Sequence, residues 1–383
     1  MDTGQKIGLL TEHMALEPDG DSPLYAPPAC DLHNPSDAGV IYGAAAGGRR
    51  VKLLKTLLTS ACERDCYYCP FRAGRNFQRE TMQPDELSAS FSHMVRAGQV
   101  EGLFLSSALA GGGVKTQDRL IATAEILRQK HGFHGYLHLK IMPGAEKEQV
   151  LRAMQLADRV SINLEAPNEK RLGYLAPHKN FWEELFTRLR WVEDVRRSLP
   201  GEQAWKGHWP SVTTQFVVGA AGENDLELLT TSEYLFRQFH LARTYYSAFN
   251  PIPDTPLQDH IPENPVRQQR LYQASFLLRD YGFCLEDLPF EQTGFLPLTI
   301  DPKRAWAEQN LSEQPIDINR ADRAQLLRVP GIGPKTADHL LSERHRNPLH
   351  TVSDLARLGI PVQKSTPFIL LDGKRPAHQM SLW

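Results

Sequence analysis

The sequence predicts an α/β fold followed by a small all-α domain. Short apolar runs alternate with longer amphipathic stretches as far as residue 300, and a tight glycine turn joins two helical segments near the C-terminus. The chain has 383 residues, of which 41% are hydrophobic and 23% are charged. At roughly 150 residues per domain, this length allows one large domain and a small one. The ordinary globular composition excludes disorder as the main state.

The apolar runs predict six strands, at residues 51–60, 103–110, 135–142, 159–165, 212–219 and 244–249. Between them lie helix-like segments with Leu or Val at three- and four-residue steps, at residues 118–131, 145–157, 180–199 and 226–239. Six strands that alternate with helices indicate a parallel sheet curved into a partial (βα)6 barrel. In such barrels the functional site lies at the carboxyl ends of the strands.

The apolar segments are too short to cross a membrane. Residues 102–110 are a typical example, whereas a bilayer needs about 20 apolar residues. Residues 1–10 lack the basic start and the long apolar run of a signal peptide. We therefore expect a soluble, cytoplasmic protein with no membrane partner.

Three of the five cysteines fall within eight residues, in the run Cys62-x3-Cys66-x2-Cys69. This spacing places three thiolates on one short loop, where they can hold a soft metal centre. Three protein ligands leave an open coordination position, which a reactive metal site needs. The alternative is a structural zinc ion completed by Cys30, Cys284 or a histidine. Cys284 stands in an apolar context that predicts a buried thiol, whereas the loop-like context of Cys30 leaves a catalytic or auxiliary role open.

The cysteine spacing, with Tyr68 directly before the third cysteine, resembles the signature of radical S-adenosylmethionine (SAM) enzymes. The resemblance implies that Cys62, Cys66 and Cys69 hold a [4Fe-4S] cluster and that SAM chelates the open iron. In that family, reductive cleavage of SAM yields methionine and a 5′-deoxyadenosyl radical that abstracts a substrate hydrogen. An electron donor such as flavodoxin or ferredoxin is implied as well.

The same resemblance marks seven residues as SAM contacts: Tyr68, Ser106, Ser107, Ser161, Asn163, Glu165 and Gly219. The polar residues of the fourth predicted strand alternate with apolar ones, so they share one face. Gly219 ends the fifth strand in a turn similar to the adenine-side turn of the family. The two serines precede a glycine triplet, residues 111–113, which resembles the family's motif for the SAM amino group but lacks its usual acidic residue. For the polar face of the fourth predicted strand, the alternative is a solvent-facing edge. For the glycine triplet, the alternative is a flexible loop.

A second module follows residue 301. Residues 316–383 carry 10 Lys and Arg against 6 Asp and Glu, and a Gly-Ile-Gly turn at residues 331–333 joins two helical segments. The N–H groups at the start of the second helix form an anion site to which Lys335 adds charge. The turn resembles the helix-hairpin-helix motif, which implies binding to the DNA backbone without sequence preference. The expected nucleic-acid contacts are Gly331, Ile332, Gly333, Lys335 and Thr336. A hairpin that serves only protein contacts is the alternative.

Over nearly its whole length, the chain resembles a bacterial group of DNA modification/repair radical SAM proteins. The implied domains are an N-terminal extension at 1–49, a partial (βα)6 radical SAM barrel at 50–300, and a linker with a helix-hairpin-helix domain at 301–383. Members of that group tend to be encoded beside a uracil-DNA-glycosylase-like protein, which implies a repair partner. The expected function is a radical SAM enzyme that acts on DNA. A tRNA- or other RNA-modifying radical SAM enzyme, and a non-enzymatic iron-sulfur DNA-binding redox sensor, are the alternatives.

Overall fold

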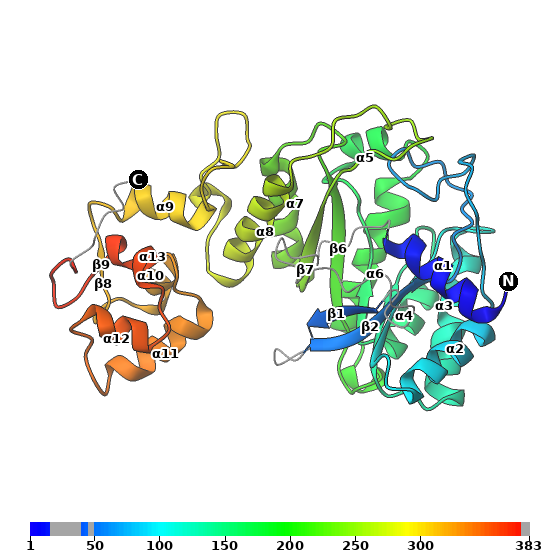
Figure 1. Ribbon diagram of the computed structural model, residues 1–383, viewed down its shortest axis with the longest axis horizontal. Helices are drawn as coiled ribbons and strands as arrows, with labels where there is room; N and C mark the ends of the chain where they lie inside the picture. Colours follow the sequence, from blue (N-terminus) through cyan, green and yellow to red (C-terminus); the bar gives the residue numbers. More distant parts are fainter. Residues whose placement is uncertain (16–39, 45–49, 377–383) are drawn as a thin grey trace. The chain divides into compact units, whose positions relative to one another are not determined.

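The computed structural model describes residues 1–15, 40–44 and 50–376 (Figure 1). The chain forms two compact units. The barrel unit contains residues 1–223 and 234–263, and the hairpin unit contains residues 224–233 and the chain from residue 264 onward.

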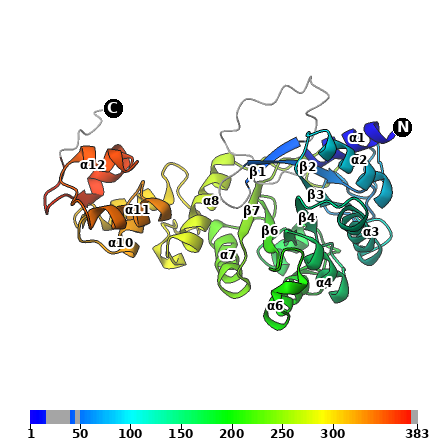
Figure 2. The same cartoon turned by 90° about the horizontal axis from the view of Figure 1, so that it is seen from below.

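The barrel unit is built on a sheet that has seven strands in the described part of the chain. Their order in space follows their order in the sequence: β1 (Val40–Ala44), β2 (Arg50–Leu57), β3 (Gly102–Ser106), β4 (Tyr136–Lys140), β5 (Arg159–Ser161), β6 (Ser211–Val218) and β7 (Arg243–Ala248). Strands β2 to β7 are parallel, and β1 pairs with β2 in the antiparallel sense. The six parallel strands form a half-barrel (Figure 2), which confirms the predicted fold class.

Helices follow the strands and cover the outer face of the sheet (Figure 2). They are α2 (Pro84–Arg96), α3 (Gly113–Glu125), α4 (Lys147–Leu156), α6 (Thr187–Ser198) and α7 (Asp225–Phe239), of which α7 belongs to the barrel unit from residue 234 onward. A short helix, α5 (Glu169–Leu175), follows β5. Helix α3 continues as a π-helical turn at Ile126–Lys130, and α6 follows another at Phe181–Phe186. The four predicted helices are therefore present. Their start signals are local, as in α5, where the Asn168 side chain accepts a hydrogen bond from the Arg171 N–H.

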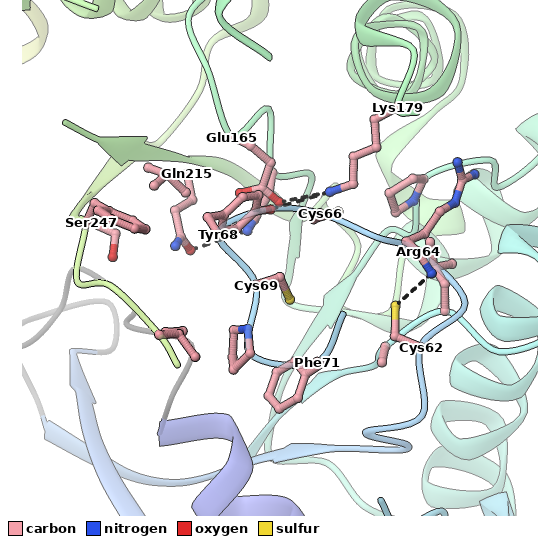
Figure 3. A pocket seen from close by; sticks show the side chains of 18 of the residues that line it. Cys62, Arg64, Cys66, Tyr68, Cys69, Phe71, Glu165, Lys179, Gln215 and Ser247 are labelled. Carbon is pink, nitrogen blue, oxygen red and sulfur yellow. Dashed lines mark hydrogen bonds and ion pairs between the residues drawn. The ribbon is translucent and has the colours of Figure 1, made fainter. Parts of the chain in front are cut away.

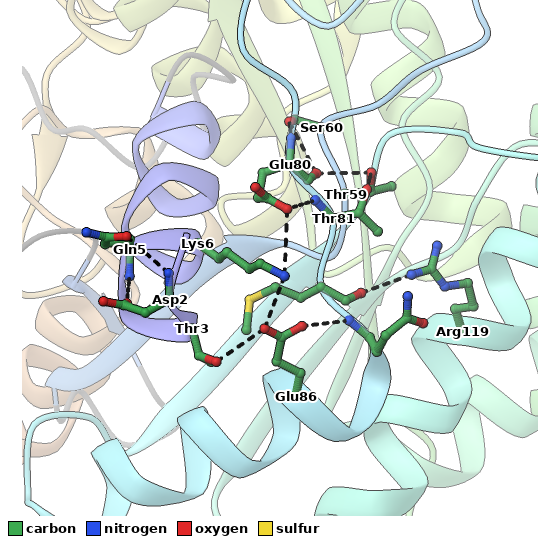
Figure 4. Close-up of polar contacts among 12 residues, drawn as sticks. Asp2, Thr3, Gln5, Lys6, Thr59, Ser60, Glu80, Thr81, Glu86 and Arg119 are labelled. Carbon is green, nitrogen blue, oxygen red and sulfur yellow. Dashed lines mark hydrogen bonds and ion pairs between the residues drawn. The ribbon is translucent and has the colours of Figure 1, made fainter.

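Helix α1 (Thr3–Ala15) packs against β2 and α2. The polar side of α1 contacts α2 and the segment that precedes α2 (Figure 4). The Lys6 ammonium lies 3.3 Å from the Glu86 carboxylate, and the Thr3 hydroxyl donates to the same carboxylate. On its other side, Leu10 and Met14 are fully buried. Neither α1 nor β1 is predicted from the sequence.

The hairpin unit is mainly helical, as predicted. It contains α8 (Pro265–Asp280), α9 (Pro302–Asn310), α10 (Arg323–Arg328), α11 (Pro334–Arg344), α12 (Val352–Arg357) and α13 (Val362–Ser365). Two short strands, β8 (Ile316–Asp317) and β9 (Ile369–Leu370), pair in parallel and tie the ends of this helical array together. Ile318, Leu326, Leu340 and Leu355 are fully buried in its core. No helix among the described residues is long and apolar enough to span a membrane.

Candidate active site

The cysteine run lies on the loop that follows β2, at the carboxyl end of the first parallel strand. Cys62, Cys66 and Cys69 all line one cavity of about 500 Å³ (Figure 3). The other walls come from the carboxyl ends of the remaining parallel strands and include Ser107, Lys140, Asn163, Gln215 and Ser247. The cavity therefore occupies the position at which parallel barrels place their functional sites.

The cysteine loop is anchored to the start of α3. The Glu63 carboxylate accepts the N–H groups of Gly111 and Gly112, both at 3.0 Å. A Cβ atom on the next residue, Gly113, would lie 2.0 Å from the Pro143 carbonyl oxygen. The glycine triplet therefore anchors the cysteine loop through the N–H groups of Gly111 and Gly112, and Gly113 packs closely against the Pro143 backbone.

The segment that follows α5 holds the other side of the cysteine loop. The Tyr67 N–H donates to the Leu175 carbonyl at 2.7 Å. Arg64 donates to the His178 carbonyl at 2.9 Å and forms an ion pair with Glu184. These contacts fix the cysteine loop from a region more than a hundred residues away in the sequence.

A buried charged group lies beside the cysteines. The Lys179 ammonium is 3.5 Å from the Glu165 carboxylate, and both side chains are only 8% exposed. Lys179 also lies 3.5 Å from the Tyr68 hydroxyl, which forms a hydrogen bond with Glu165 (Figure 3). Glu165 has a backbone φ of 65°, in the left-handed region that residues other than glycine rarely adopt. The surrounding structure therefore holds this carboxylate in a strained position.

The electrostatics of this group keep Lys179 charged. Burial alone would lower the pKa of Lys179, but Cys66 and Glu165 outweigh it, so the pKa is raised. Burial raises the pKa of Cys66, which Lys179 partly opposes. Burial, and then Glu165, raises the pKa of Tyr68 well above its ordinary value. The cysteines therefore face a permanent ammonium and a neutral phenol. The sequence gives no signal for Lys179, because it lies in a loop that no strand-end pattern marks.

Four of the seven predicted SAM contacts line the cavity: Tyr68, Ser107, Asn163 and Glu165. The other three lie outside its lining. The Ser161 hydroxyl is 2.9 Å from His138 Nε2, Ser106 is fully buried, and the Gly219 N–H donates to Glu223. The roles of all seven stay predictions.

His138 is a buried base below the cavity that the sequence does not mark. Its ring stacks on Phe104 with centroids 4.2 Å apart. Burial lowers the pKa of His138 well below its ordinary value, and the cations Arg159, Lys140 and Lys55 add to this effect. The His138 ring is therefore kept neutral beside these cations.

The donor set fits an iron-sulfur cluster better than a single metal ion. Among the described residues, no three His, Cys, Asp or Glu side chains are grouped closely enough to hold one ion. Cys284 is half-buried, not buried as predicted, and its thiol donates to Asp287 in the hairpin unit at 3.2 Å. Cys30 lies outside the described residues. A [4Fe-4S] cluster offers a separate iron to each thiolate, so its ligands surround a larger body and need not converge on one point. Three cysteine side chains that form no disulfide line one cavity, with polar groups beyond them, and this arrangement fits such a cluster and SAM.

The hairpin unit presents a second candidate site. Helices α10 and α11 flank the turn at Gly331, whose φ of 86° requires glycine or strain. A surface cavity is lined by Asp280, Gly333, Pro334, Lys335 and Thr336. Three of the five predicted nucleic-acid contacts line it. Ile332 is only 1% exposed, its N–H donates to the Val329 carbonyl at 3.1 Å, and its carbonyl accepts from Lys303, so it supports the turn from inside.

Comparison with known families identifies both sites. Residues 56–235 match the model of the Radical SAM superfamily, and residues 315–343 match the helix-hairpin-helix motif. The chain therefore contains a radical SAM domain and a C-terminal helix-hairpin-helix motif. Members of this superfamily use a [4Fe-4S] cluster and SAM.

Several solved structures are similar to the chain. Methylornithine synthase (PylB) is 12% identical, with a TM-score of 0.47, over 73% of this chain and 70% of that one. The FeFe-hydrogenase maturase HydG from Carboxydothermus hydrogenoformans is 15% identical, with a TM-score of 0.46, over 59% and 51%. The chain thus spans about half the length of that maturase. Coproporphyrinogen III oxidase (HemN) from Escherichia coli, a radical SAM enzyme, is 14% identical, with a TM-score of 0.38, over 58% and 51%. Among curated proteins, no sequence matches the chain.

Proposed function

We propose that this enzyme cleaves SAM reductively to modify or repair DNA. One observation carries the proposal: a single chain combines a cysteine-lined cavity of about 500 Å³ with a hairpin whose second helix begins beside Lys335. The first feature suits radical chemistry, and the second suits a phosphate backbone.

In this proposal, the residues of the cavity bind the cluster, bind SAM or exclude water. Cys62, Cys66 and Cys69 would hold the cluster, which supplies the electron that cleaves SAM and generates the radical. Tyr68, Ser107, Asn163 and Glu165 are the SAM contacts that the cavity lining supports best, and Ser106, Ser161 and Gly219 would act from behind it. Apolar walls at Leu109, Ile141, Met142 and Phe249 would exclude water from the reacting atoms.

The hairpin would hold the nucleic acid by its backbone. Gly331 and Gly333 would contribute main-chain groups, and Lys335 and Thr336 would contribute side chains, whereas the predicted contact Ile332 would support the turn from inside. A base inside an intact duplex cannot enter the cavity, so we expect damaged, flipped or single-stranded DNA to be the preferred substrate. The extraction of a base then costs less than the few kcal/mol that an intact stack requires. A flavodoxin or ferredoxin as electron donor, and a uracil-DNA-glycosylase-like repair protein, are the expected partners.

An anaerobic assay tests the proposal. The protein is reconstituted with iron and sulfide, SAM and dithionite are added, and 5′-deoxyadenosine is quantified without nucleic acid, with intact or frayed DNA duplex, and with tRNA. We expect DNA to stimulate product formation, the frayed duplex to do so more strongly, and Cys66→Ala to abolish it. The matched control is Cys284→Ala, which removes a thiol from the hairpin unit and should retain both iron and activity.

The other outcomes separate the alternatives. Stimulation by tRNA and not by DNA would identify an RNA-modifying enzyme. DNA affinity that changes with cluster oxidation state, in a protein with a full cluster that never cleaves SAM, would identify a redox sensor.

A further inference from the structure

A lysine of α9 is buried against the hairpin turn. Lys303 is 8% exposed, and its ammonium donates to the Ile332 carbonyl at 2.6 Å. The same ammonium lies 4.6 Å from the centroid of the Tyr281 ring. Lys303 and Ile332 are distant in the sequence, so this contact is a product of the tertiary fold.

The surroundings of Lys303 are unusual for a buried cation. Buried lysines normally have a carboxylate partner, but among the described residues Lys303 forms no ion pair. The charged groups that face it are Asp301, which caps its own helix, and Arg328 of α10. Burial, opposed in part by Asp301 and reinforced by Arg328, lowers the pKa of Lys303 to about 7.

The contact fixes the direction of one peptide group. The Ile332 carbonyl and the Gly333 N–H belong to the same planar trans peptide, so they point in opposite directions. Because Lys303 holds the carbonyl inward, the Gly333 N–H must point away from α9. Gly333 is the residue that precedes α11 and lines the surface cavity with Lys335 and Thr336. The buried lysine thus orients a donor of the expected phosphate site.

We propose that Lys303 is a positioning residue of the nucleic-acid site, and that through it the affinity for phosphate backbone falls as the pH rises through neutrality. This inference rests on the proposed binding of DNA by the hairpin. The protonated amine holds the Ile332 carbonyl more strongly than the neutral amine does, and it adds positive charge near the bound phosphate. Phosphate binding therefore favours proton uptake by Lys303.

The size of the effect is limited by one proton. Phosphate binding raises the pKa of Lys303 above its value in the free protein. At pH values between these two pKa values, the affinity for DNA falls by at most about tenfold per pH unit. Below that interval the affinity should not depend on the protonation of this residue.

The test measures binding of a fluorescent DNA duplex to the full chain by anisotropy at constant ionic strength, from about pH 6 to about pH 8.5, an interval that brackets the pKa near 7. We expect the affinity of the wild type to fall across this interval. Lys303→Met should bind several-fold more weakly at low pH and lose the pH dependence. Lys303→Arg keeps its charge at every pH of the series, so it should also lose the pH dependence while it retains more affinity. Lys374→Met, which removes an exposed lysine from the same unit, should retain the wild-type pH dependence.

A DNA-free measurement separates the two hypotheses. In an NMR titration of the lysine side-chain amines, the resonance that disappears in Lys303→Met should titrate near neutral pH. If it titrates in the ordinary range of lysine, or if Lys303→Met binds DNA with the affinity and pH dependence of the wild type, the role of Lys303 is wrong. If Lys303 titrates near neutrality but the wild type binds no DNA at any pH, the proposed function of the hairpin is wrong. The proposed coupling between protonation of Lys303 and DNA binding is then wrong as well. Circular dichroism of each variant verifies that the hairpin unit is folded.

Discussion

Two buried lysines distinguish the barrel unit from the hairpin unit. Lys179 in the barrel unit and Lys303 in the hairpin unit are each about 8% exposed. The pKa of Lys179 is nevertheless raised, whereas that of Lys303 is lowered to about 7. Burial disfavours the charged form in both cases, so the difference comes from the partners: Lys179 faces Glu165 and the cysteines, and Lys303 faces a carbonyl, an aromatic ring and Arg328.

The difference indicates how each site responds to its surroundings. In the barrel unit, opposite charges are paired in the interior, so the charge beside the cysteines stays constant around neutral pH. In the hairpin unit, one buried amine lies close to its titration point. We therefore expect the charge in the cavity to change little with pH and the stability of the barrel unit to depend strongly on its ion pair. In the hairpin unit we expect DNA affinity to change with pH and stability to depend only weakly on Lys303.

The largest expected effect is that of Lys179→Met. Removal of the ammonium leaves the Glu165 carboxylate buried without its partner, which should lower the free energy of unfolding by about 3–5 kcal/mol. Lys303→Met removes no ion pair, so it should cost about 1 kcal/mol. Urea unfolding of both variants at neutral pH measures the contrast. Equal losses would show that the two lysines do not differ in the way proposed, and Lys179→Met combined with Glu165→Leu should recover much of the loss.

The next effect compares a glycine from each unit. A Cβ at Gly113 would lie 2.0 Å from the Pro143 carbonyl oxygen, so Gly113→Ala should cost about 3 kcal/mol and loosen the cysteine loop. In the hairpin unit, Gly331→Ala places a side chain at a φ of 86° with its nearest atom 3.2 Å away, and should cost about 1–2 kcal/mol. Thermal unfolding and iron content after reconstitution report both effects.

Gly112→Ala is the matched control within the same loop. Its φ is 89°, but no other atom lies within 4 Å of the Cβ position, so the cost should be about 1–2 kcal/mol from backbone strain alone. If Gly113→Ala is no worse than Gly112→Ala, the close approach to Pro143 does not anchor the loop.

A smaller expected effect is the loss of folding stability at low pH. The pKa of His138 lies well below the ordinary value of 6.5, so below pH 6.5 the unfolded chain binds a proton that the folded chain excludes. The contribution of His138 is fully present above pH 6.5 and should be lost at up to about 1.4 kcal/mol per pH unit as the pH falls. His138→Phe, which retains a ring to stack on Phe104, should reduce this slope. Chemical unfolding across the acid range measures it, and an unchanged slope would assign the acid sensitivity to other groups.

The smallest effect concerns Lys335. Lys335→Met should weaken DNA binding only a few-fold, because the exposed lysine would contribute a single phosphate contact under the proposed function. The slope of the logarithm of affinity against the logarithm of salt concentration should fall by about one. A salt titration of duplex binding tests this. An unchanged slope would indicate that Lys335 faces no phosphate.

Much of the fold is predictable because its signals are local. Apolar runs and helical periodicity predict the six parallel strands and the helices between them, and cysteine spacing predicts three thiols on one loop. The glycine turn at residues 331–333 predicts the helical hairpin in the same way. Four of the predicted SAM contacts line the cavity because they lie on the cysteine loop or directly after β3 and β5, at the carboxyl ends of parallel strands.

The sequence by itself therefore determined the fold class, the superfamily signature and the hairpin. Only the tertiary structure decided that Lys179 meets Glu165 beside the cysteines, that Glu63 caps the glycine triplet, and that Lys303 holds the hairpin turn. It also placed Ser106, Ser161 and Gly219 outside the cavity lining, because the exact end of each strand depends on its neighbours in the sheet. The physical reason is the distance along the chain over which each interaction acts. Periodicity and turn chemistry act over a few residues, whereas ion pairs, caps and burial join segments whose meeting is specified only by the packing of the whole chain.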